Sequence, residues 1–489
     1  MRVLHIASEV APFAQSGGLA DVVAGLSAAQ AESHGLPAAV LVPLYRGVAA
    51  KLALDDGVPV ALAFGAHRFD ARIRTAQVGR VRYGFLDCAP LYDRAGTLYG
   101  PGGGADFDDN HVRFAALGAA AALAGDALLG GAPDVIHCHD WQAGYAAIAA
   151  RAMTPKPLVV ATIHNLAFRG LFPKAAMAEL GIPWDLFTPD KLEFYDQLSF
   201  LKAGLALADA VTTVSPTYAR EILTPERGEG LDGFLRWNVQ RLVGIVNGID
   251  AVAWDPATDA ALPARFSRDD LAGKARCRAA LAAELPLTLG PTDALAAVIA
   301  RFADQKGIDL VADLVPDLAA LGARLVVLGS GDPALESRFR YLAETFHEHV
   351  AVRIGFDHAL SRRIYAGADL FLMPSRFEPC GLGQLYAMRY GTVPIVHAVG
   401  GLRDTVLDPY SASPFGDAAR PGQAVPCEPG AGIRFEPDTV PALRAAVARG
   451  VALCRDPDAL GKVRRLGMQR DSSWTASAQQ YVQLYRSLR

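Results

Sequence analysis

The sequence predicts an α/β protein with two doubly wound, Rossmann-like domains that face a cleft. Short apolar runs alternate with helical patterns along the whole chain, as in parallel sheets whose strands are connected by helices. This alternation stops and restarts near the middle of the sequence. The length of 489 residues also exceeds what one hydrophobic core usually serves, so at least two domains are expected.

The elements of the first half follow from the positions of its apolar residues. Helical patterns at 21–31 and 142–152 lie between runs that are short enough to be buried strands. An Ala-rich run at 115–129 is interrupted by glycine and aspartate, which favours a packed helix over a membrane span. The first domain is therefore predicted to cover 1–246, with strands at 3–7, 39–43, 135–138, 159–163 and 210–214.

The second half repeats this pattern after a segment with Trp254 and several prolines, which has the composition of a linker. The second domain is predicted to cover 247–465. Residues 408–432 are rich in Pro, Gly, Ser and Ala and are expected to form a surface loop. Residues 466–489 form a third segment, an amphipathic helix with apolar side chains at helical spacing. The expected strands of the second domain are 295–300, 324–328, 350–354, 370–373 and 393–396.

Composition and charge argue against several classes of protein. The net charge is −4, and without a basic run or zinc-finger spacing the sequence does not favour a nucleic-acid partner. The six cysteines are scattered and form no CxxC pair, which argues against a disulfide framework or a zinc site and favours a reducing compartment. The first ten residues contain an apolar stretch too short for a signal peptide. We therefore expect a cytoplasmic protein without a membrane partner.

One carboxylate stands just after a predicted strand. Residues 370–373 are followed by Glu378, and glycines follow where a helix should begin. In open α/β sheets ligands bind at the carboxyl ends of the strands, and free N–H groups at a helix start favour phosphate. Glu378 is therefore a candidate ligand-binding residue, and a solvated glutamate beside a helix cap is the alternative.

Two motifs that follow predicted strands have the chemistry of phosphate binding. Near the start, residues 15–18 (Gln-Ser-Gly-Gly) open a helix, and paired glycines allow backbone amides to approach a pyrophosphate. In the second half, Arg301 and Lys306 follow the first strand and could offset charge on a leaving diphosphate. A plain tight turn and a pair of solvated surface charges are the respective alternatives.

Histidines follow or end two other strands. The stretch 137–140 offers His, Cys, His and Asp, but alternate residues of a strand point to opposite faces and no second cluster completes a coordination shell, so no metal site is expected. His164 is a candidate to hydrogen-bond a substrate hydroxyl or carbonyl group, and a satisfied core histidine is the alternative. Asn247 lies at the predicted domain junction, either as a turn or as a hinge that lines the cleft.

Taken together, these motifs resemble the family of bacterial glycogen synthases and plant starch synthases, which are retaining glucosyltransferases. The resemblance covers nearly the whole chain and is specific because many motifs occur in one order, at 8–12, 162–165, 246–250, 305–307, 376–382 and 400–406. It implies a glycosyltransferase-B fold in which the last helix crosses back to the first domain. It also implies ADP-glucose as the donor, an α-1,4-glucan such as glycogen as the acceptor, and no further cofactor.

The same resemblance assigns roles to individual residues. Arg301 and Lys306 would neutralise the leaving ADP, and Phe356 would stack on its adenine. The implied catalytic residues are Glu378, His164, Arg301, Lys306 and Asp140. The implied substrate-binding residues are Gln15, Gly17, Gly18, Tyr99, Asn247, Phe356, Cys380, Gly381 and Leu382.

Four positions depart from the family pattern. The family's first motif begins with Lys where this chain has Gln15, and Ser16, His397 and Arg403 are also unusual. A neutral amide at position 15 removes one cation from the diphosphate end. A charged phosphate contact contributes about 1.5–3 kcal/mol and a neutral one about half of that, so the loss corresponds to about a tenfold decrease in donor affinity or rate. Arg403 is a candidate to restore charge nearby.

We expect transfer of glucose to the non-reducing 4-OH of the glucan with retention at the anomeric carbon. No second carboxylate is clearly placed as a nucleophile, so attack on the same face, assisted by the leaving phosphate, is favoured over double inversion. The alternative hypothesis is a catalytically weak or silent paralogue that binds glucan or nucleotide sugar as a regulatory partner, which the departures at Gln15 and His397 favour. A third hypothesis, a phosphorylase that uses pyridoxal phosphate, would need Lys274 or Lys306 for the Schiff base, and neither has a supporting sequence context.

Overall fold

The computed structural model describes residues 1–408 and 430–489, which form two compact units. Unit 1 consists of Met1–Gly248 and Ser473–Arg489, and unit 2 of Ile249–Ser472. Most of the expected surface loop at 408–432 lies outside the described residues. Within the described ranges, no helix has the length and apolar character that crossing a membrane requires.

Unit 1 is built on a nine-stranded sheet with the order β12-β11-β7-β6-β1-β2-β5-β4-β3. Seven neighbouring strands are parallel, and β4 and β3 add an antiparallel hairpin at one edge. The strands are β1 (Val3–Ile6), β2 (Ala38–Pro43), β3 (Val58–Phe64), β4 (His67–Val78), β5 (Val81–Asp87), β6 (Val135–His139), β7 (Leu158–Ile163), β11 (Ala210–Thr213) and β12 (Leu242–Gly244).

Helices cover this sheet, and a second, three-stranded sheet with the order β8-β10-β9 lies in the same unit. The Ala-rich run is helical, as expected, and most of α3 is buried. The predicted helix at 142–152 begins as a 3-10 turn at Trp141–Ala143 and continues as α5. The remaining bounds are α1 (Gly18–Glu32), α2 (Ala89–Tyr92), α3 (Asn110–Ala121), α4 (Gly125–Leu129), α5 (Gly144–Ala150), β8 (Leu171–Pro173), α6 (Ala176–Glu179), β9 (Glu193–Phe194), β10 (Gln197–Ser199), α7 (Phe200–Ala206), α8 (Pro216–Glu221) and α9 (Asp232–Asn238).

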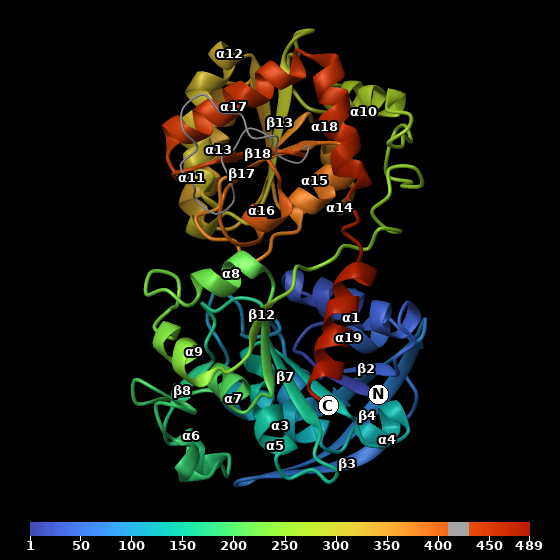
Figure 1. Ribbon diagram of the computed structural model, residues 1–489, viewed down its shortest axis with the longest axis vertical. Coiled ribbons are helices and arrows are strands. Elements are labelled where there is room, and N and C mark those ends of the chain that lie inside the picture. Colours follow the sequence, from blue (N-terminus) through green and yellow to red (C-terminus); the bar gives the residue numbers. More distant parts are fainter. Residues whose placement is uncertain (409–429) are drawn as a thin grey trace. The chain divides into compact units, whose positions relative to one another are not determined.

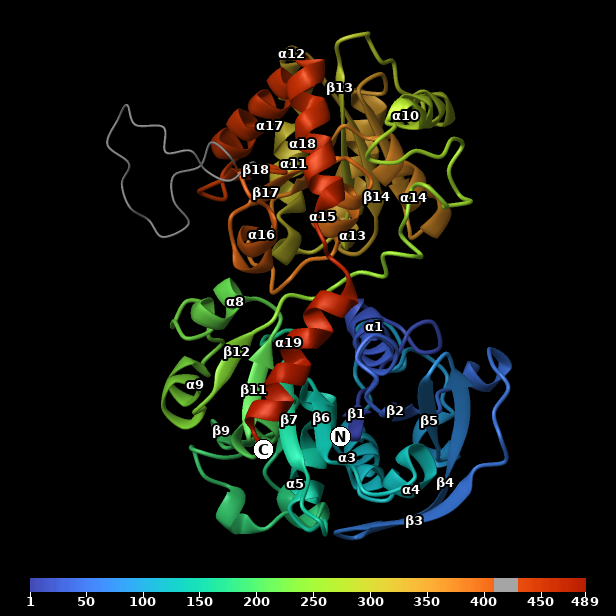
Figure 2. The ribbon, with the colours of Figure 1, turned by 45° about the vertical axis from the view of Figure 1, so that its right-hand side comes forward.

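The C-terminal helix α19 (Trp474–Ser487) belongs to unit 1, as the resemblance implied. It lies beside α1, red against blue in both ribbon views (Figures 1 and 2). Trp474, Tyr481 and Tyr485 pack with Val22 and Leu26 of α1 in one buried cluster. Gly25 allows this close approach, because a Cβ there would lie 2.0 Å from Nε1 of Trp474.

The predicted third segment, 466–489, starts too early. Residues 466–469 complete α18 (Pro457–Gln469) of unit 2, and the chain rejoins unit 1 only at Ser473. The physical reason is the burial of Met468, which packs into the hydrophobic core of unit 2.

Unit 2 contains a six-stranded parallel sheet with the order β15-β14-β13-β16-β17-β18. In chain order this is 3-2-1-4-5-6, the order of the Rossmann fold. The elements are α10 (Ala272–Glu284), β13 (Ala294–Ile299), α11 (Ile308–Leu314), α12 (Leu318–Leu321), β14 (Ala323–Gly329), α13 (Pro333–Thr345), β15 (Val350–Ile354), α14 (His358–Gly367), β16 (Leu370–Met373), α15 (Gly383–Arg389), β17 (Val393–His397), α16 (Gly400–Thr405), β18 (Ile433–Phe435), α17 (Val440–Cys454) and α18.

Two hydrophobic clusters, one on each face, hold helices on this sheet. Alternate residues of β13 point to opposite faces, so Ala296 and Val298 join one cluster and Leu295 and Ala297 the other. The first cluster takes in α11, α13 and α17, and the second α10, α14 and α15. Burial on both faces explains why these strands are continuous apolar runs in the sequence.

Trp474 provides a test of how strongly α19 holds to unit 1. Trp474→Ala should lower the free energy of unfolding of unit 1 by about 3–5 kcal/mol, because a buried aromatic side chain is lost and a cavity remains. Urea unfolding and limited proteolysis of the C-terminal helix measure the effect. Trp237→Ala is the matched control: this side chain of α9 is 84 % exposed, so its loss should change stability by less than about 0.5 kcal/mol. Equal effects of the two substitutions would contradict the packing described.

Candidate active site

The strand order reverses once in each unit, and the predicted site residues cluster at these two points. In unit 1 the reversal lies between β1 and β6, and in unit 2 between β13 and β16. Connections leave the two central strands in opposite directions there, so the carboxyl ends of the strands are left open for a ligand. Asp140 directly follows β6, and Lys306 belongs to the connection after β13.

The glycine-rich loop of unit 1 is organised by a carboxylate that sequence reasoning gave no role. Glu9 is 3 % exposed and accepts hydrogen bonds from the backbone amides of Ser16 (2.5 Å) and Gly17 (3.2 Å) and from the Ser16 hydroxyl (2.6 Å). The hydroxyl of Tyr99 also donates to Glu9 and lies 2.8 Å from Oγ of Ser8. The amides of Ser16 and Gly17 therefore already have an anionic partner inside the protein.

The exposed side of this loop is formed by the remaining residues of the motif. Gln15 is exposed, and its amide donates to Oδ2 of Asp21 at 3.1 Å. Gly18 is the first residue of α1, and nothing within 4 Å opposes a side chain at Gly17. A lysine, Lys51, donates to the carbonyl of Phe13 at 2.7 Å and brings one cation to the same loop.

Asp140 has an unusual backbone conformation and an unusual acidity. Its φ of 56° and ψ of −169° lie in a region that L-residues rarely adopt. Its Oδ1 accepts the backbone amide of His164 at 2.7 Å, so the residues that end β6 and β7 are bound to each other. Desolvation of the carboxyl raises its pKa from 3.8 to about 7, although hydrogen bonds from the amides of His164 and Asn165 act in the opposite direction.

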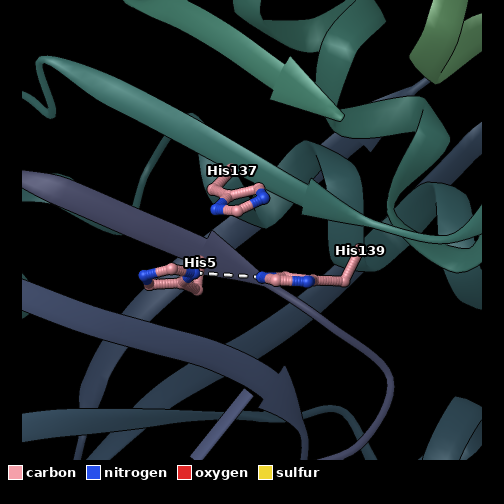
Figure 3. A group of neighbouring side chains, drawn as sticks. All are labelled: His5, His137 and His139. Atoms are coloured by element: carbon pink, nitrogen blue, oxygen red, sulfur yellow. Dashed lines mark hydrogen bonds between the residues drawn. The ribbon is translucent and has the colours of Figure 1, made fainter. Parts of the chain in front are cut away.

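Three buried histidines lie together on the two central strands of the sheet: His5 on β1 and His137 and His139 on β6 (Figure 3). His5 and His137 are partners in the register of the two strands. The register between β1 and β6 adds His5 as a third histidine beside His137 and His139, a neighbour that the spacing within one segment does not show. Cys138 lies between the two histidines of β6 and so points to the opposite face.

The three histidines are close enough together to hold a metal ion, but their nitrogen atoms are already joined by hydrogen bonds. One nitrogen of each ring lies within 4.8 Å of the others. However, Nδ1 of His5 and Nε2 of His139 are 3.0 Å apart and share a proton. A zinc ion would need a free lone pair on each of these nitrogens and would lie about 2.0–2.1 Å from both. Both nitrogens of His137 also have partners, the hydroxyls of Thr162 (2.6 Å) and Tyr485 (2.7 Å).

In unit 2 the structure brings Lys306 and Glu378 together. Nζ of Lys306 lies 2.6 Å from Oε2 of Glu378, and the Ser375 hydroxyl donates to the same oxygen at 3.1 Å. Two features fix the packing of the loops that carry Lys306 and Glu378. Gly307 has φ of 60°, and a Cβ there would lie 2.0 Å from the carbonyl oxygen of Pro374. Arg376 makes a two-pronged ion pair with Asp309 of α11 at 2.8 and 2.6 Å.

The other predicted residues of unit 2 differ in exposure and in their contacts. Arg301 is exposed, and its guanidinium has no hydrogen-bond partner among the described residues. Phe356 is 74 % exposed and touches only the ring of His358 among the aromatic side chains described. The loop 380–382 precedes α15, and the side chain of Gln384 binds the carbonyls of Cys380 (3.1 Å) and Gly381 (3.0 Å).

Asn247, His397 and Arg403 have different surroundings. Oδ1 of Asn247 is buried and lacks a partner among the described residues, so it can accept a hydrogen bond from a ligand. His397 binds the carbonyl of Ser375 through Nδ1 at 2.7 Å and so supports the Glu378 loop. Arg403 pairs with Glu436 and binds the carbonyl of Ala398, which leaves little of its charge for a phosphate.

Neither lysine considered for a pyridoxal phosphate cofactor is suited to a Schiff base. Lys274 is 2 % exposed, and its ammonium group binds the carbonyls of Ala366 and Tyr390 and the hydroxyl of Thr392 at 2.8–2.9 Å. Lys306 is held by Glu378.

Comparisons with known proteins agree with this architecture. The family model for the starch synthase catalytic domain matches residues 2–237, and that for glycosyl transferases group 1 matches 286–413. The glycogen synthase of Anaeromyxobacter dehalogenans (strain 2CP-1) is 47 % identical over 100 % of this chain and 99 % of its own length, and that of Myxococcus xanthus is 46 % identical over 100 % and 99 %.

Solved structures give the same result at the level of the fold. One of them is the catalytic domain of starch synthase IV from Arabidopsis thaliana, bound to ADP and acarbose. It superimposes with a TM-score of 0.86 at 33 % identity, and the match covers 100 % of this chain and 99 % of that domain. The sucrose-phosphate synthase of Thermosynechococcus elongatus matches with a TM-score of 0.61 at 20 % identity, which supports the fold alone. The protein is thus a glycosyltransferase with the glycosyltransferase-B fold. It belongs to the glycogen synthase family.

Asp140 predicts a pH dependence of stability. Its pKa is higher in the folded protein, about 7, than the unperturbed 3.8, so the folded state binds more protons between these values and the free energy of unfolding falls as pH rises through them. Each unit of pKa shift is worth at most about 1.4 kcal/mol. Asp140→Asn should therefore weaken the fall in melting temperature between pH 5 and pH 8.

The control for this experiment is Asp55→Asn, for which the sign is reversed. Partial burial acts to raise the pKa of Asp55, but hydrogen bonds from Thr75 and Gly57 outweigh it and lower the pKa. Asp55 therefore stabilises the fold at neutral pH and loses this effect in acid, so its removal should leave the melting curve between pH 5 and pH 8 parallel to that of the wild type. A parallel curve for Asp140→Asn as well would show that Asp140 ionises normally.

Proposed function

We propose that the protein transfers glucose from ADP-glucose to the non-reducing 4-OH of an α-1,4-glucan, with retention at the anomeric carbon. The observation that carries the proposal is the Lys306–Glu378 pair beside an unpaired Arg301 at the strand reversal of unit 2. This arrangement offers positive charge to a diphosphate and a hydrogen-bonding carboxylate to a sugar within one loop cluster. The ADP and acarbose bound to starch synthase IV support both substrate classes.

Unit 2 would bind the nucleotide sugar. Arg301 is exposed and uncompensated, so a bound diphosphate gains a full ion pair there, whereas at Lys306 it competes with Glu378. Phe356 presents an exposed ring on which adenine can stack. Glu378 would accept hydrogen bonds from the hydroxyls of the transferred glucose, and the backbone N–H groups of 380–382 would donate to its oxygens.

Unit 1 would bind the acceptor. His164 and Asn247 each present an acceptor atom without a partner among the described residues, which suits the hydroxyl groups of a sugar. Asp140 supports His164 through its backbone amide. On the donor side, the exposed edge of the loop formed by Gln15, Gly17 and Gly18 would meet the diphosphate, with Tyr99 behind it through Glu9.

The roles of the two carboxyl groups favour same-face attack. Glu378 is neutralised by Lys306, and Asp140 is bound by two backbone amides and has a pKa of about 7, so neither is poised as a nucleophile. In the proposed step the bond between the anomeric carbon and the diphosphate oxygen breaks while the 4-OH oxygen bonds to the same face. The 4-OH proton passes to the departing phosphate oxygen, whose charge Arg301 and Lys306 stabilise.

The proposal includes no cofactor beyond ADP-glucose and places the reaction in the cytoplasm. The described cysteines are free thiols, which suits a reducing compartment. A regulatory paralogue without activity is the second candidate, motivated by Gln15. Purified protein incubated with ADP-glucose and glycogen separates the two, because only the enzyme lengthens α-linked chains, and a β-linked product would contradict retention.

Glu378 supplies the first test of the mechanism. Glu378→Gln should keep the fold and reduce kcat at least tenfold, because a hydrogen-bonding carboxylate beside the transferred sugar becomes neutral and Lys306 loses its partner. Glu284→Gln is the control, since it removes the same charge from a surface ion pair with Arg363 in the same unit. Initial rates with saturating ADP-glucose decide the outcome. Equal rates for the two variants would reduce Glu378 to a structural residue.

Gln15 supplies the second test. Gln15→Lys should lower the KM for ADP-glucose up to about tenfold, because an ammonium group compensates diphosphate charge and an amide does not. The gain should be smaller at high salt, where an exposed ion pair is screened. It should also be limited by Asp21, which binds the Gln15 amide and would pair in part with the new ammonium group. Gln77→Lys on β4 adds the same charge at an exposed position elsewhere in the unit and should leave KM unchanged. An unchanged KM for Gln15→Lys would indicate that Lys51 or another cation already serves the donor.

A further inference from the structure

We propose that a buried chain of hydrogen bonds determines which ring nitrogen of His164 carries its proton, so that Nδ1 is left as an acceptor for a sugar hydroxyl. The chain, called the histidine relay below, consists of Gln30, His5 and His139. These three would be positioning residues that act through His164. The inference rests on the proposed function, because the contact between His164 and the sugar is part of it.

The relay is continuous from α1 to the end of β7. Oε1 of Gln30 lies 2.8 Å from Nε2 of His5, and Nδ1 of His5 lies 3.0 Å from Nε2 of His139. Nδ1 of His139 in turn lies 3.0 Å from Nε2 of His164. All three relay side chains are 0 % exposed, and Figure 3 shows the bond between His5 and His139. Water therefore cannot replace the hydrogen bonds that join these three side chains to one another.

The amide oxygen of Gln30, at the buried end of the relay, determines which atom donates in each hydrogen bond. An amide oxygen can only accept, so Nε2 of His5 must carry the hydrogen, and a neutral imidazole then has a bare Nδ1. His139 must donate to that bare nitrogen through its own Nε2, which leaves its Nδ1 bare. His164 must then carry its hydrogen on Nε2 as well, and its Nδ1 keeps a free lone pair.

The rings stay neutral at physiological pH, as this argument requires. Burial lowers the pKa of His5 to about 4, although the hydrogen bond to Gln30 acts to raise it, and desolvation lowers the pKa of His164 to about 3. The pKa of His139 is also far below its usual value, through burial first and the neighbouring rings second. The ring of His137 stacks on His139 with centroids 4.3 Å apart, so a charge on either ring would repel the other.

The C-terminal helix holds the Gln30 amide in the required orientation. Nε2 of Gln30 donates to the hydroxyl of Tyr485 at 3.2 Å, and that hydroxyl lies 2.7 Å from Nδ1 of His137, to which it can donate its single proton. Rotating the amide by half a turn would place two donors against His5 and reverse every proton in the relay. Tyr485 of α19 thus keeps the oxygen of Gln30 toward His5.

The relay suits orientation and not proton transport. It ends in a neutral amide, which can neither take up nor supply a proton, so a proton entering at His164 would have no exit. Its consequence lies at the other end, where Nδ1 of His164 has no hydrogen-bond partner in residues 1–408 and 430–489. A bare lone pair accepts a hydroxyl proton and repels phosphate oxygens, so it would select the sugar of the donor over its diphosphate.

Nuclear magnetic resonance of histidine labelled with ¹⁵N tests the relay without any substrate. We expect His5, His139 and His164 of the wild-type protein to show a protonated Nε2 and a bare Nδ1. In Gln30→Leu the acceptor at the end of the chain is lost, so His164 should show a mixture of the two tautomers. Tyr485→Phe removes a single oxygen atom and releases the amide of Gln30, so it should give the same mixture of tautomers. This variant keeps the test available if Gln30→Leu does not fold.

Thr212→Val is the matched control. Its hydroxyl lies 2.6 Å from that of Thr162, on the branch that leads to His137 and not on the relay. The control therefore loses one buried hydrogen bond of the same kind and should leave the tautomer of His164 unchanged. A protonated Nδ1 on wild-type His164, or unchanged tautomers in both relay variants, would overturn the proposal.

Kinetics separate the relay from the proposed function. We expect Gln30→Leu to reduce kcat/KM for ADP-glucose about fivefold to tenfold, the factor that one neutral hydrogen bond supplies, and Thr212→Val to have no effect. If the wild type transfers no glucose, the proposed function fails and the tautomer measurement still decides the relay. Altered tautomers with an unaltered rate would overturn the catalytic role. Stoichiometric binding of added Zn²⁺ with shifts of the His5 and His139 signals would replace the relay by a metal site.

Discussion

The reversal of strand order is the constraint on which the rest of this molecule depends. In each unit the chain leaves β1 or β13 toward one side of the sheet and returns later to build the other side. The loops after the two central strands therefore diverge, and the polar groups that they carry are left without helical cover. Glu9 and Asp140 take this position in unit 1, where Asp140 binds His164 after the neighbouring strand β7, and Lys306 and Glu378 take it in unit 2.

The two reversals differ in their electrostatics. In unit 1 the histidine rings behind the loops are buried and neutral, and burial raises the pKa of Asp140. Desolvation therefore reduces the charge at this reversal. Unit 2 keeps an ion pair and adds an exposed, unpaired Arg301, so its charge stays available for an anion. A neutral surface for sugar hydroxyls and a cationic one for a diphosphate together match the chemistry of a glycosyltransferase that uses a nucleotide sugar.

The strands that could be predicted are those with both faces buried. All ten expected strands are present with ends within one residue, because burial on both faces demands continuous apolar runs. The hairpin strands β3 and β4, of which only β3 lies at the edge of the sheet, escaped prediction because about half of their side chains are exposed and interrupt the apolar run. The more buried β5 was missed as well. Several residues of the candidate site, among them Asp140, Lys306 and Glu378, could be proposed from the sequence because they follow the ends of strands. Glu9, His5 and Gln30 could not, since their partners lie on other elements.

The sequence by itself determined the fold class, the order of the strands along the chain, the family, and the residues that follow each strand. Those properties are local, because apolar periodicity and motif spacing are set by neighbours in the chain. Only the tertiary structure decided that His5 pairs in register with His137, that Lys306 meets Glu378, and that Tyr485 holds the amide of Gln30. These contacts join residues 72 to 455 positions apart, and their distances depend on how strands and helices pack and not on any signal within one segment.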